Sequence, residues 1–180
     1  MRFPTFVFTE ATETQRHGER LCGSVSLWRN RHMTGIQIVR ATWRDAWTLS
    51  RLDRKCFQPI DAYDWLTYLG LCLWPSVVAL KAASGGEIIG FVASDRRRRH
   101  GHAIIVTLSV DPAWRRRGLG ERLMHECEAR IDLPRVRLQV RKSNTPAIHL
   151  YLKLGYTVLG ALPRYYGDSE DGYLMEKARG

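Results

Sequence analysis

The chain of 180 residues has few cysteines: Cys22, Cys56, Cys72 and Cys127, with no C-x-x-C pair among them. Because cysteine and histidine nowhere fall at zinc-site spacing, we expect no metal centre. No apolar run approaches the roughly eighteen residues of a membrane helix, and residues 1–4 are not followed by the apolar core of a signal peptide. These absences favour a cytoplasmic protein with reduced thiols and no membrane partner.

Acidic residues are the minority, since 28 Lys and Arg against 18 Asp and Glu give a net charge of +10. Such a charge suits nucleic acid, an acidic protein surface or simply a basic protein. The densest basic run, Arg96–Arg99, lies between two β-like runs, where a solvated hairpin turn is expected. No basic groove with interleaved aromatics, zinc finger or RNA-binding motif accompanies it, so nucleic acid is not the expected partner.

The length and the 44% hydrophobic content suit one globular domain, which we place at residues 35–180. Residues 1–34 mix Thr, Glu, Arg and Gly without a sustained period, and we expect a poorly ordered N-terminal extension. Met33 lies just before the first predicted strand, so translation from Met33 is an additional hypothesis.

Hydrophobic periodicity predicts the order β-α-α-β-β-β-α-β-α-β-β. Gly85 and Gly86 indicate a hairpin turn, and Gly155 is a natural helix end. The order implies an α/β protein with a mixed central sheet and helices on both faces. The expected strands are 36–40, 76–82, 87–94, 103–110, 135–141, 156–162 and 172–177, and the expected helices are 43–56, 63–73, 119–131 and 145–154.

The segment 108–120, LSVDPAWRRRGLG, is the most informative part of the chain. Pro112 ends an apolar strand, and a basic turn then opens an amphipathic helix. Glycine lets the backbone approach a ligand, and the free N–H groups of a helix start attract phosphate. The sequence therefore predicts a pyrophosphate-binding turn, whose residues are Arg115, Arg116, Arg117, Gly118, Leu119 and Gly120.

The spacing of this turn, (R/Q)-x-x-G-x-G after V-D-P, resembles the acyl-CoA-binding motif of the GCN5-related N-acetyltransferases (GNAT). The later segment LQVRKSNTPAIHLYLKLGY, residues 138–156, is similar to the second signature of that family. The resemblance covers about residues 36–177. It implies the GNAT fold, a mostly antiparallel sheet whose splayed strands admit acetyl-CoA as cosubstrate.

The resemblance also implies how the cofactor is held. The pantetheine arm would pair with the backbone of Leu108 and Val110, as an added strand pairs with a sheet edge. Asn144 is placed to cap its helix, and by resemblance it also bonds the pantetheine.

The same resemblance assigns the chemistry. Tyr151 is the expected general acid, because its pKa of about 10, above the roughly 8.5 of a thiol, leaves a neutral phenol that can protonate the CoA thiolate. Gln139 stands where the RimI-like enzymes carry a glutamate base, and an amide cannot accept that proton. Gln139 would instead hold a water, with Asp61 or Asp64 as terminal acceptor. A weak base is easier to tolerate for an α-amine, with a pKa near 8, than for a lysine.

The C-terminal segments RYY (164–166) and EDGYLM (170–175) resemble those of RimI-like and Ard1-like protein N-terminal acetyltransferases. By that resemblance Tyr165 and Tyr166 would grip the first peptide units of an acceptor N-terminus, with Tyr63 or Trp65 across the groove. A hairpin that simply packs one of the two tyrosines is the plainer alternative.

The expected activity is thus acetyl transfer to a protein N-terminal α-amine, possible acceptors including a ribosomal protein, by direct attack in a ternary complex. Two alternatives remain open. One is a small-amine acetyltransferase of the same fold, and the other is a non-catalytic CoA-binding or ribosome-associated module.

Overall fold

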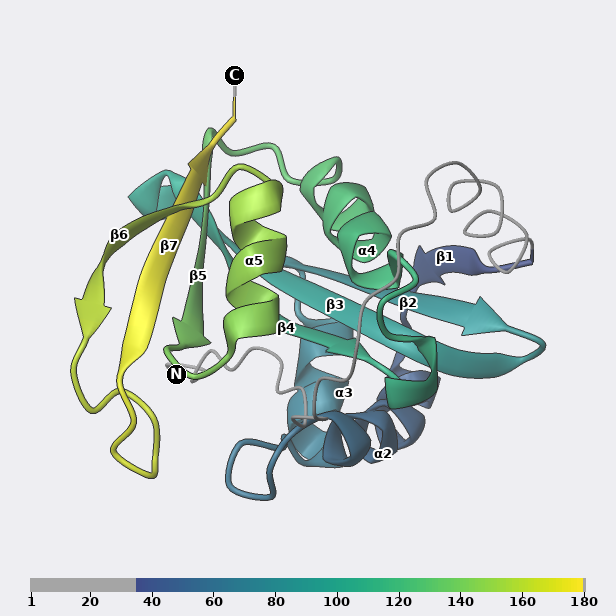
Figure 1. Cartoon of the computed structure of the whole chain (residues 1–180). Helices are drawn as coiled ribbons and strands as arrows, with labels where there is room; N and C mark the ends of the chain where they lie inside the picture. Colours follow the sequence, from purple (N-terminus) through teal and green to yellow (C-terminus); the bar gives the residue numbers. More distant parts are fainter. Residues whose placement is uncertain (1–34, 180) are drawn as a thin grey trace, which may run out of the picture.

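The computed structural model describes residues 35–179, and its elements follow the predicted order along the chain (Figure 1). The expected N-terminal extension, residues 1–34, and the hypothetical start at Met33 lie outside the described residues.

Seven strands form one sheet in the order β1-β2-β3-β4-β5-β7-β6. Every neighbouring pair is antiparallel except β4 and β5, which run parallel. The mixed, mostly antiparallel sheet is therefore as predicted. The strands are β1 Gln37–Arg40, β2 Val77–Ser84, β3 Glu87–Arg97, β4 His102–Val110, β5 Arg135–Arg141, β6 Thr157–Leu162 and β7 Gly172–Ala178.

Helices cover both faces of the sheet, with α2 and α3 on one side and α4 and α5 on the other (Figure 1). The side chains of β4 alternate accordingly. Ser109 reaches a side chain of α2, whereas a β-carbon added to Gly120 of α4 would lie 3.8 Å from Val110. The helices are α2 Ala46–Cys56, α3 Trp65–Leu73, α4 Leu119–Glu128 and α5 Thr145–Lys153, with short 3-10 turns at Trp43–Asp45, Arg98–His100 and Pro112–Trp114.

Local signals account for where the helices begin and end. Asp64 accepts a hydrogen bond from the backbone N–H of Thr67, so α3 begins at Trp65 rather than at Tyr63. Asn144 caps α5 in the same way through Ala147, as expected. Gly155, at a φ of 88°, follows the end of α5. The predicted end of α4 at residue 131 was too late, because the helix stops at Glu128.

A buried carboxylate ties the α2–α3 side to the sheet. All nine residues of β4 are buried. Beneath them Asp53 of α2 accepts hydrogen bonds from Tyr68 Oη at 2.5 Å, Ser109 Oγ at 3.0 Å and the backbone N–H of Tyr63 at 2.8 Å. Burial raises the pKa of Asp53 to about 6, although the hydrogen bonds oppose this shift.

Candidate active site

The parallel strands β4 and β5 pair over only a short distance. Their register contains Ala103 opposite Val136 and Ile104 opposite Arg137. Immediately after these residues the register between β4 and β3 shifts by one. Thr107 pairs with Ala93, whereas Ile105 pairs with the next residue of β3, Ser94. Val106 is therefore an extra residue on β4, and a β-bulge of this kind bends its strand. The bulge stands where β4 and β5 part, and it opens the sheet toward the carboxyl end of β4.

The backbone of β4 faces this opening at two positions. Asp111 donates its N–H to the carbonyl of Ile89 on β3 at 2.9 Å. Because backbone groups of an antiparallel strand alternate in direction, Ser109 also faces β3, and Leu108 and Val110 face away from it. The carbonyl of Val110 accepts bonds from Arg115 Nε at 3.2 Å and Cys56 Sγ at 3.3 Å, in keeping with this direction.

A cleft of about 280 Å³ lies beside the opening, between the start of α4 and the first turns of α5. Gly118, at a φ of 85°, caps α4 in the left-handed conformation that favours glycine. The N–H groups of the first helical turn follow directly. The residues lining the cleft are Val110, Trp114, Arg115, Arg116, Gly118, Leu119, Gly120, Glu121, Pro146, Ala147, His149 and Leu150.

The three consecutive arginines lie differently relative to this cleft. Arg115 lines it, but its Nε binds the Val110 carbonyl and so anchors the turn. Arg116 lines it with a φ of 57°. Arg117 is not among the lining residues, and its guanidinium lies 5.1 Å from the centre of the Trp114 ring. The contribution of Arg117 to the phosphate site stays a prediction, since its guanidinium stacks on the ring of Trp114, which lines the cleft.

Gly120, the second residue of α4, also lines the cleft. A β-carbon at this position would lie 3.4 Å from Leu150 Cδ2 of α5, an ordinary contact distance, so the packing of the two helices does not by itself require glycine. The close approach of the Gly120 backbone to a ligand stays a prediction, whereas Gly118 supplies the backbone conformation that starts the helix.

On the acceptor side, several buried polar atoms have no hydrogen-bond partner within the described residues. They include Gln139 Oε1 on β5, Tyr151 Oη on α5, Thr107 Oγ1 on β4 and Asp61 Oδ1 before α3. Buried polar groups normally find partners, so such a set on β4, β5, α5 and the segment before α3 indicates a place for substrate or water. Tyr151 is fully buried, and burial raises the pKa of its phenol well above the ordinary value.

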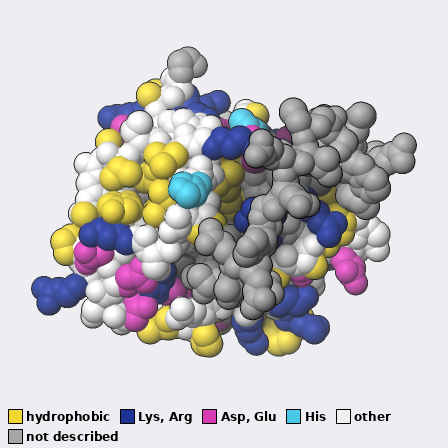
Figure 2. All heavy atoms as spheres, in the orientation of Figure 1, with side chains coloured by type: hydrophobic (Ala, Val, Ile, Leu, Met, Phe, Trp, Pro, Cys, Tyr) yellow, Lys and Arg dark blue, Asp and Glu magenta, His cyan; other side chains and the backbone are white. Residues whose placement is uncertain are grey.

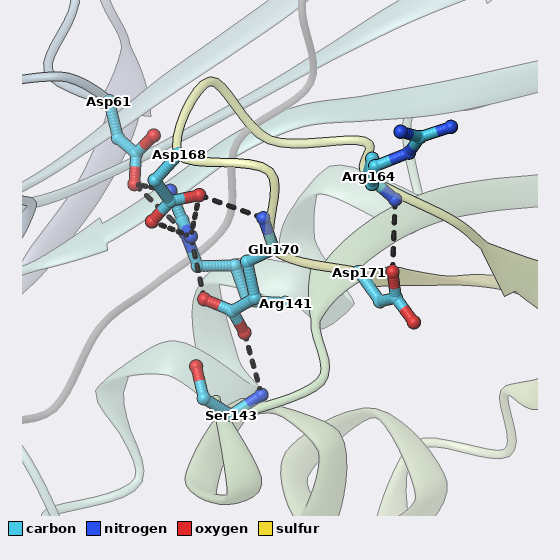
Figure 3. A network of polar contacts seen from close by, with 7 residues as sticks. All are labelled: Asp61, Arg141, Ser143, Arg164, Asp168, Glu170 and Asp171. Atoms are coloured by element: carbon cyan, nitrogen blue, oxygen red, sulfur yellow. Dashed lines mark hydrogen bonds and ion pairs between the residues drawn. The ribbon is translucent and has the colours of Figure 1, made fainter.

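Arg141 joins the segments around the acceptor side (Figure 3). Its side chain is 3% exposed and binds Asp61 through Nε and Nη2, while Nη1 reaches Asp168 and Glu170 of the β6–β7 loop. Figure 2 shows acidic side chains gathered near this loop. One cation thus meets three carboxylates, which leaves a local excess of negative charge. Burial raises the pKa of Asp61 although the bonds from Arg141 lower it.

The other candidate acceptor residues divide between exposed and buried positions. Tyr165 is 37% exposed, whereas Tyr166 is buried with its ring 4.2 Å from the Arg141 guanidinium carbon. Tyr63 is buried beside Tyr68, and Trp65 is exposed at the start of α3. The carboxylate of Asp64 caps α3 and so has a structural task, and its alternative role as a proton acceptor stays a prediction.

Comparison with known proteins agrees with this geometry. The model of the acetyltransferase (GNAT) family matches residues 36–156. The chain belongs to the GNAT family. It is accordingly an acetyltransferase, and the seven-stranded open sheet is the GNAT fold.

Two curated GNAT relatives carry N-terminal acetyltransferase names. The chain is 38% identical over 122 residues to the N-terminal acetyltransferase B complex catalytic subunit NAA20 of Arabidopsis thaliana, covering 63% of this chain and 68% of the relative. The figures are the same for N-alpha-acetyltransferase 20 of Dictyostelium discoideum. Among solved structures, Ard1 from Thermoplasma volcanium superposes with a TM-score of 0.70 and 28% identity, covering 81% of this chain and 98% of that one.

Arg141 is the residue of this GNAT site that sequence reasoning missed. It lies within the quoted second signature, two positions after Gln139, and therefore on the same face of β5. Asp168 and Glu170 were the available signal, because neighbouring carboxylates in one loop favour a cation partner. Thr107 gave no such signal, since a threonine within an apolar strand is common and does not indicate a functional site.

No group of three or more His, Cys, Asp or Glu side chains between residues 35 and 179 is arranged to hold a metal ion. Within the same range no helix is long and apolar enough to span a membrane.

Proposed function

We propose that this GNAT enzyme transfers the acetyl group of acetyl-CoA to the α-amine of a protein or peptide N-terminus. The observation that carries the proposal is the opening between β4 and β5 beside a helix N-terminus, in a chain 38% identical to two N-α-acetyltransferases. The amine attacks the thioester carbonyl directly while cofactor and acceptor are both bound.

The cofactor would lie across the cleft and the opening. Its diphosphate meets the N–H groups that follow Gly118, with the charge of Arg116 beside them. Its pantetheine arm runs along the backbone of Leu108 and Val110, as an added strand, and passes the side chain of Asn144. The N–H groups beside the opening polarise the thioester carbonyl and stabilise the tetrahedral intermediate.

Tyr151 serves the leaving group in this proposal. Its buried hydroxyl has no hydrogen-bond partner within the described residues, so it is able to donate to the sulfur. Because burial raises the phenol pKa further above that of a thiol, complete proton transfer to the thiolate is uphill. The phenol therefore acts chiefly as a hydrogen-bond donor that stabilises charge on the departing sulfur.

Proton removal from the amine would proceed through water. Gln139 Oε1 on β5 and Thr107 Oγ1 on the neighbouring strand β4 are buried and have no partner within the described residues, and in this proposal they hold the water molecule. Asp61, with its second oxygen unpartnered and its pKa raised by burial, is the nearby carboxylate suited to receive the proton. An α-amine needs little help, because about a tenth of it is already neutral at pH 7.

The acceptor chain would enter between the two loops that Arg141 joins. Exposed Tyr165 contacts its first peptide units, with Tyr63 on the opposite side and buried Tyr166 as support. We further propose ribosomal proteins among the acceptors and the cytoplasm as the location. The buried free thiols of Cys56, Cys72 and Cys127 support a reducing compartment.

The test follows release of free thiol from acetyl-CoA with a panel of N-terminal peptides and a panel of small amines. Peptide-dependent release is expected, and release with small amines alone would overturn the proposed acceptor. In the same assay Tyr151→Phe should lower turnover at least tenfold and leave cofactor affinity unchanged. Tyr173→Phe, which removes a phenol hydroxyl from β7, is the matched control and should retain turnover. Equal turnover of the two variants would remove Tyr151 from the mechanism.

A further inference from the structure

An ion pair bridges α4 and α5 at the edge of the proposed cofactor cleft. Lys153 Nζ lies 2.6 Å from Glu121 Oε2, with side-chain exposures of 60% and 32%. Glu121 is the third residue of α4 and Lys153 is the last residue of α5. A surface ion pair of this kind usually contributes little to the stability of the fold. We therefore relate the pair to the cleft beside it.

One member of the ion pair lines the proposed cofactor cleft, and the other lies just beyond it. Glu121 lines the cleft together with His149 of α5. Because residues four apart share one face of a helix, Lys153 lies one turn beyond His149 on that same face. The start of α4 lies beside α5 here, since a β-carbon at Gly120 would lie 3.4 Å from Leu150 Cδ2.

Glu121 presents an electrostatic difficulty for the proposed cofactor site. A carboxylate in the first turn suits the positive end of an empty helix. The same turn is proposed to receive a diphosphate, and like charges a few ångströms apart repel strongly near a protein surface. Between residues 35 and 179 the ion-pair partner of Glu121 is Lys153, and no arginine pairs with it.

We propose that Lys153 is a positioning residue for cofactor binding that cancels the charge of Glu121 beside the diphosphate. The inference rests on the proposed placement of the diphosphate at the start of α4. It makes Lys153, which does not line the cleft, a determinant of affinity for coenzyme A. Glu121 is then the residue through which Lys153 acts, and the effect of Lys153 disappears when Glu121 is neutral.

The experiment measures the Kd of coenzyme A by titration calorimetry for the full chain and three variants at about 50 mM salt. Lys153→Gln should raise Kd roughly fivefold, because an unmasked carboxylate then faces the diphosphate. Glu121→Gln should leave Kd unchanged or lower it, and the double variant should return to within about twofold of the wild type. At about 1 M salt, where the screening length is near 3 Å, the effect of Lys153→Gln should fall below about twofold.

Arg130→Gln is the matched control. It removes one positive charge and one ion pair, with Glu126, just beyond the other end of α4, and it should leave Kd within about twofold of the wild type. If Arg130→Gln weakens binding as much as Lys153→Gln, only net charge matters and the inference fails.

Three other outcomes would also overturn the inference. Unchanged affinity of Lys153→Gln would show that the pair is irrelevant. Equal weakening by Glu121→Gln would mean that the pair only braces the helices. A double variant as weak as Lys153→Gln would mean that the lysine contacts the cofactor itself. In all three cases the wild type still binds coenzyme A, whereas failure of the wild type to bind would overturn the proposed function.

Discussion

Arg141 and Asp61 stand 80 positions apart in the sequence, and in the folded chain Arg141 Nη2 lies 2.6 Å from Asp61 Oδ2. Both side chains are 3% exposed. The pair joins the segment before α3 to the end of β5, and further bonds of Arg141 add the β6–β7 loop (Figure 3). The shape of the proposed acceptor entrance therefore depends on one guanidinium.

Removing that guanidinium should destabilise the fold. Arg141→Gln leaves the carboxylate of Asp61 buried without a counter-charge, which typically costs about 3 to 5 kcal/mol. Denaturant unfolding measures the loss. Arg137 lies on the same face of β5 and forms a partly exposed ion pair with Glu176 of β7. Arg137→Gln should therefore lower the free energy of unfolding by only about 1 kcal/mol or less. Equal losses of unfolding free energy in the two variants would contradict the view that Arg141 neutralises a buried carboxylate.

Asp53 should make stability depend on pH. Its folded-state pKa of about 6 lies above the ordinary 3.8, so folding binds a proton between these two values. The stabilisation from that proton is complete below about pH 4 and is lost as pH rises through about 6.

Comparison with Asp53→Asn isolates this contribution. The free energy of unfolding of the wild type, minus that of the variant, should fall by about 2 to 3 kcal/mol between pH 4 and pH 7, at about 1.4 kcal/mol per pKa unit. Denaturant unfolding across this range tests the prediction. Parallel pH profiles for the two proteins would refute the raised pKa.

A glutamate at position 139 should compensate for the missing base. Gln139→Glu places a carboxylate at the opening, and general base catalysis is worth roughly 10² to 10⁴. We expect kcat/KM for an N-terminal peptide to rise at least threefold at pH 7, and the gain to shrink above about pH 8, where the α-amine is already neutral. A pH profile of peptide acetylation measures this. No gain at any pH, with an unchanged peptide KM, would indicate that the Asp61 route already suffices.

Two glycines should respond oppositely to alanine. Gly118→Ala meets open space but must adopt a φ of 85°, so it should cost about 1 to 2 kcal/mol and weaken coenzyme A binding. Gly70→Ala also meets open space, in the ordinary conformation of α3, and should stabilise by about 0.5 to 1 kcal/mol. Thermal unfolding and calorimetry test both. A neutral Gly118→Ala would show that the left-handed cap is not required.

Short-range features of the sequence predicted much of this molecule. Element order, the cap at Asn144 and the hairpin at Gly85 and Gly86 depend on residues close together in the chain, and they agree with the structure. Strand order beyond neighbouring hairpins, including the position of β7 between β5 and β6, was not predicted, because it depends on pairing between segments far apart in the chain.

The roles of individual charged residues were harder to predict, because they depend on distant partners. Nothing local distinguishes Arg117, which stacks on a ring, from Arg116, which lines the cleft. Asp61 and Asp64 look alike in the sequence, yet one is buried against a strand residue far along the chain and the other caps its own helix. Only the fold decides between such neighbours.

The extra residue Val106 leaves the two parts of the sheet, β1 to β4 and β5 to β7, sharing a very short ladder. Beyond this ladder, backbone hydrogen bonding between the two parts of the sheet would have to come from a molecule bound in the opening between β4 and β5. A pantetheine arm that pairs with Leu108 and Val110 would act as a temporary eighth strand. When the arm leaves, the opening between β4 and β5 is empty again. Amide hydrogen exchange at these two residues would then report occupancy directly, before any chemistry takes place.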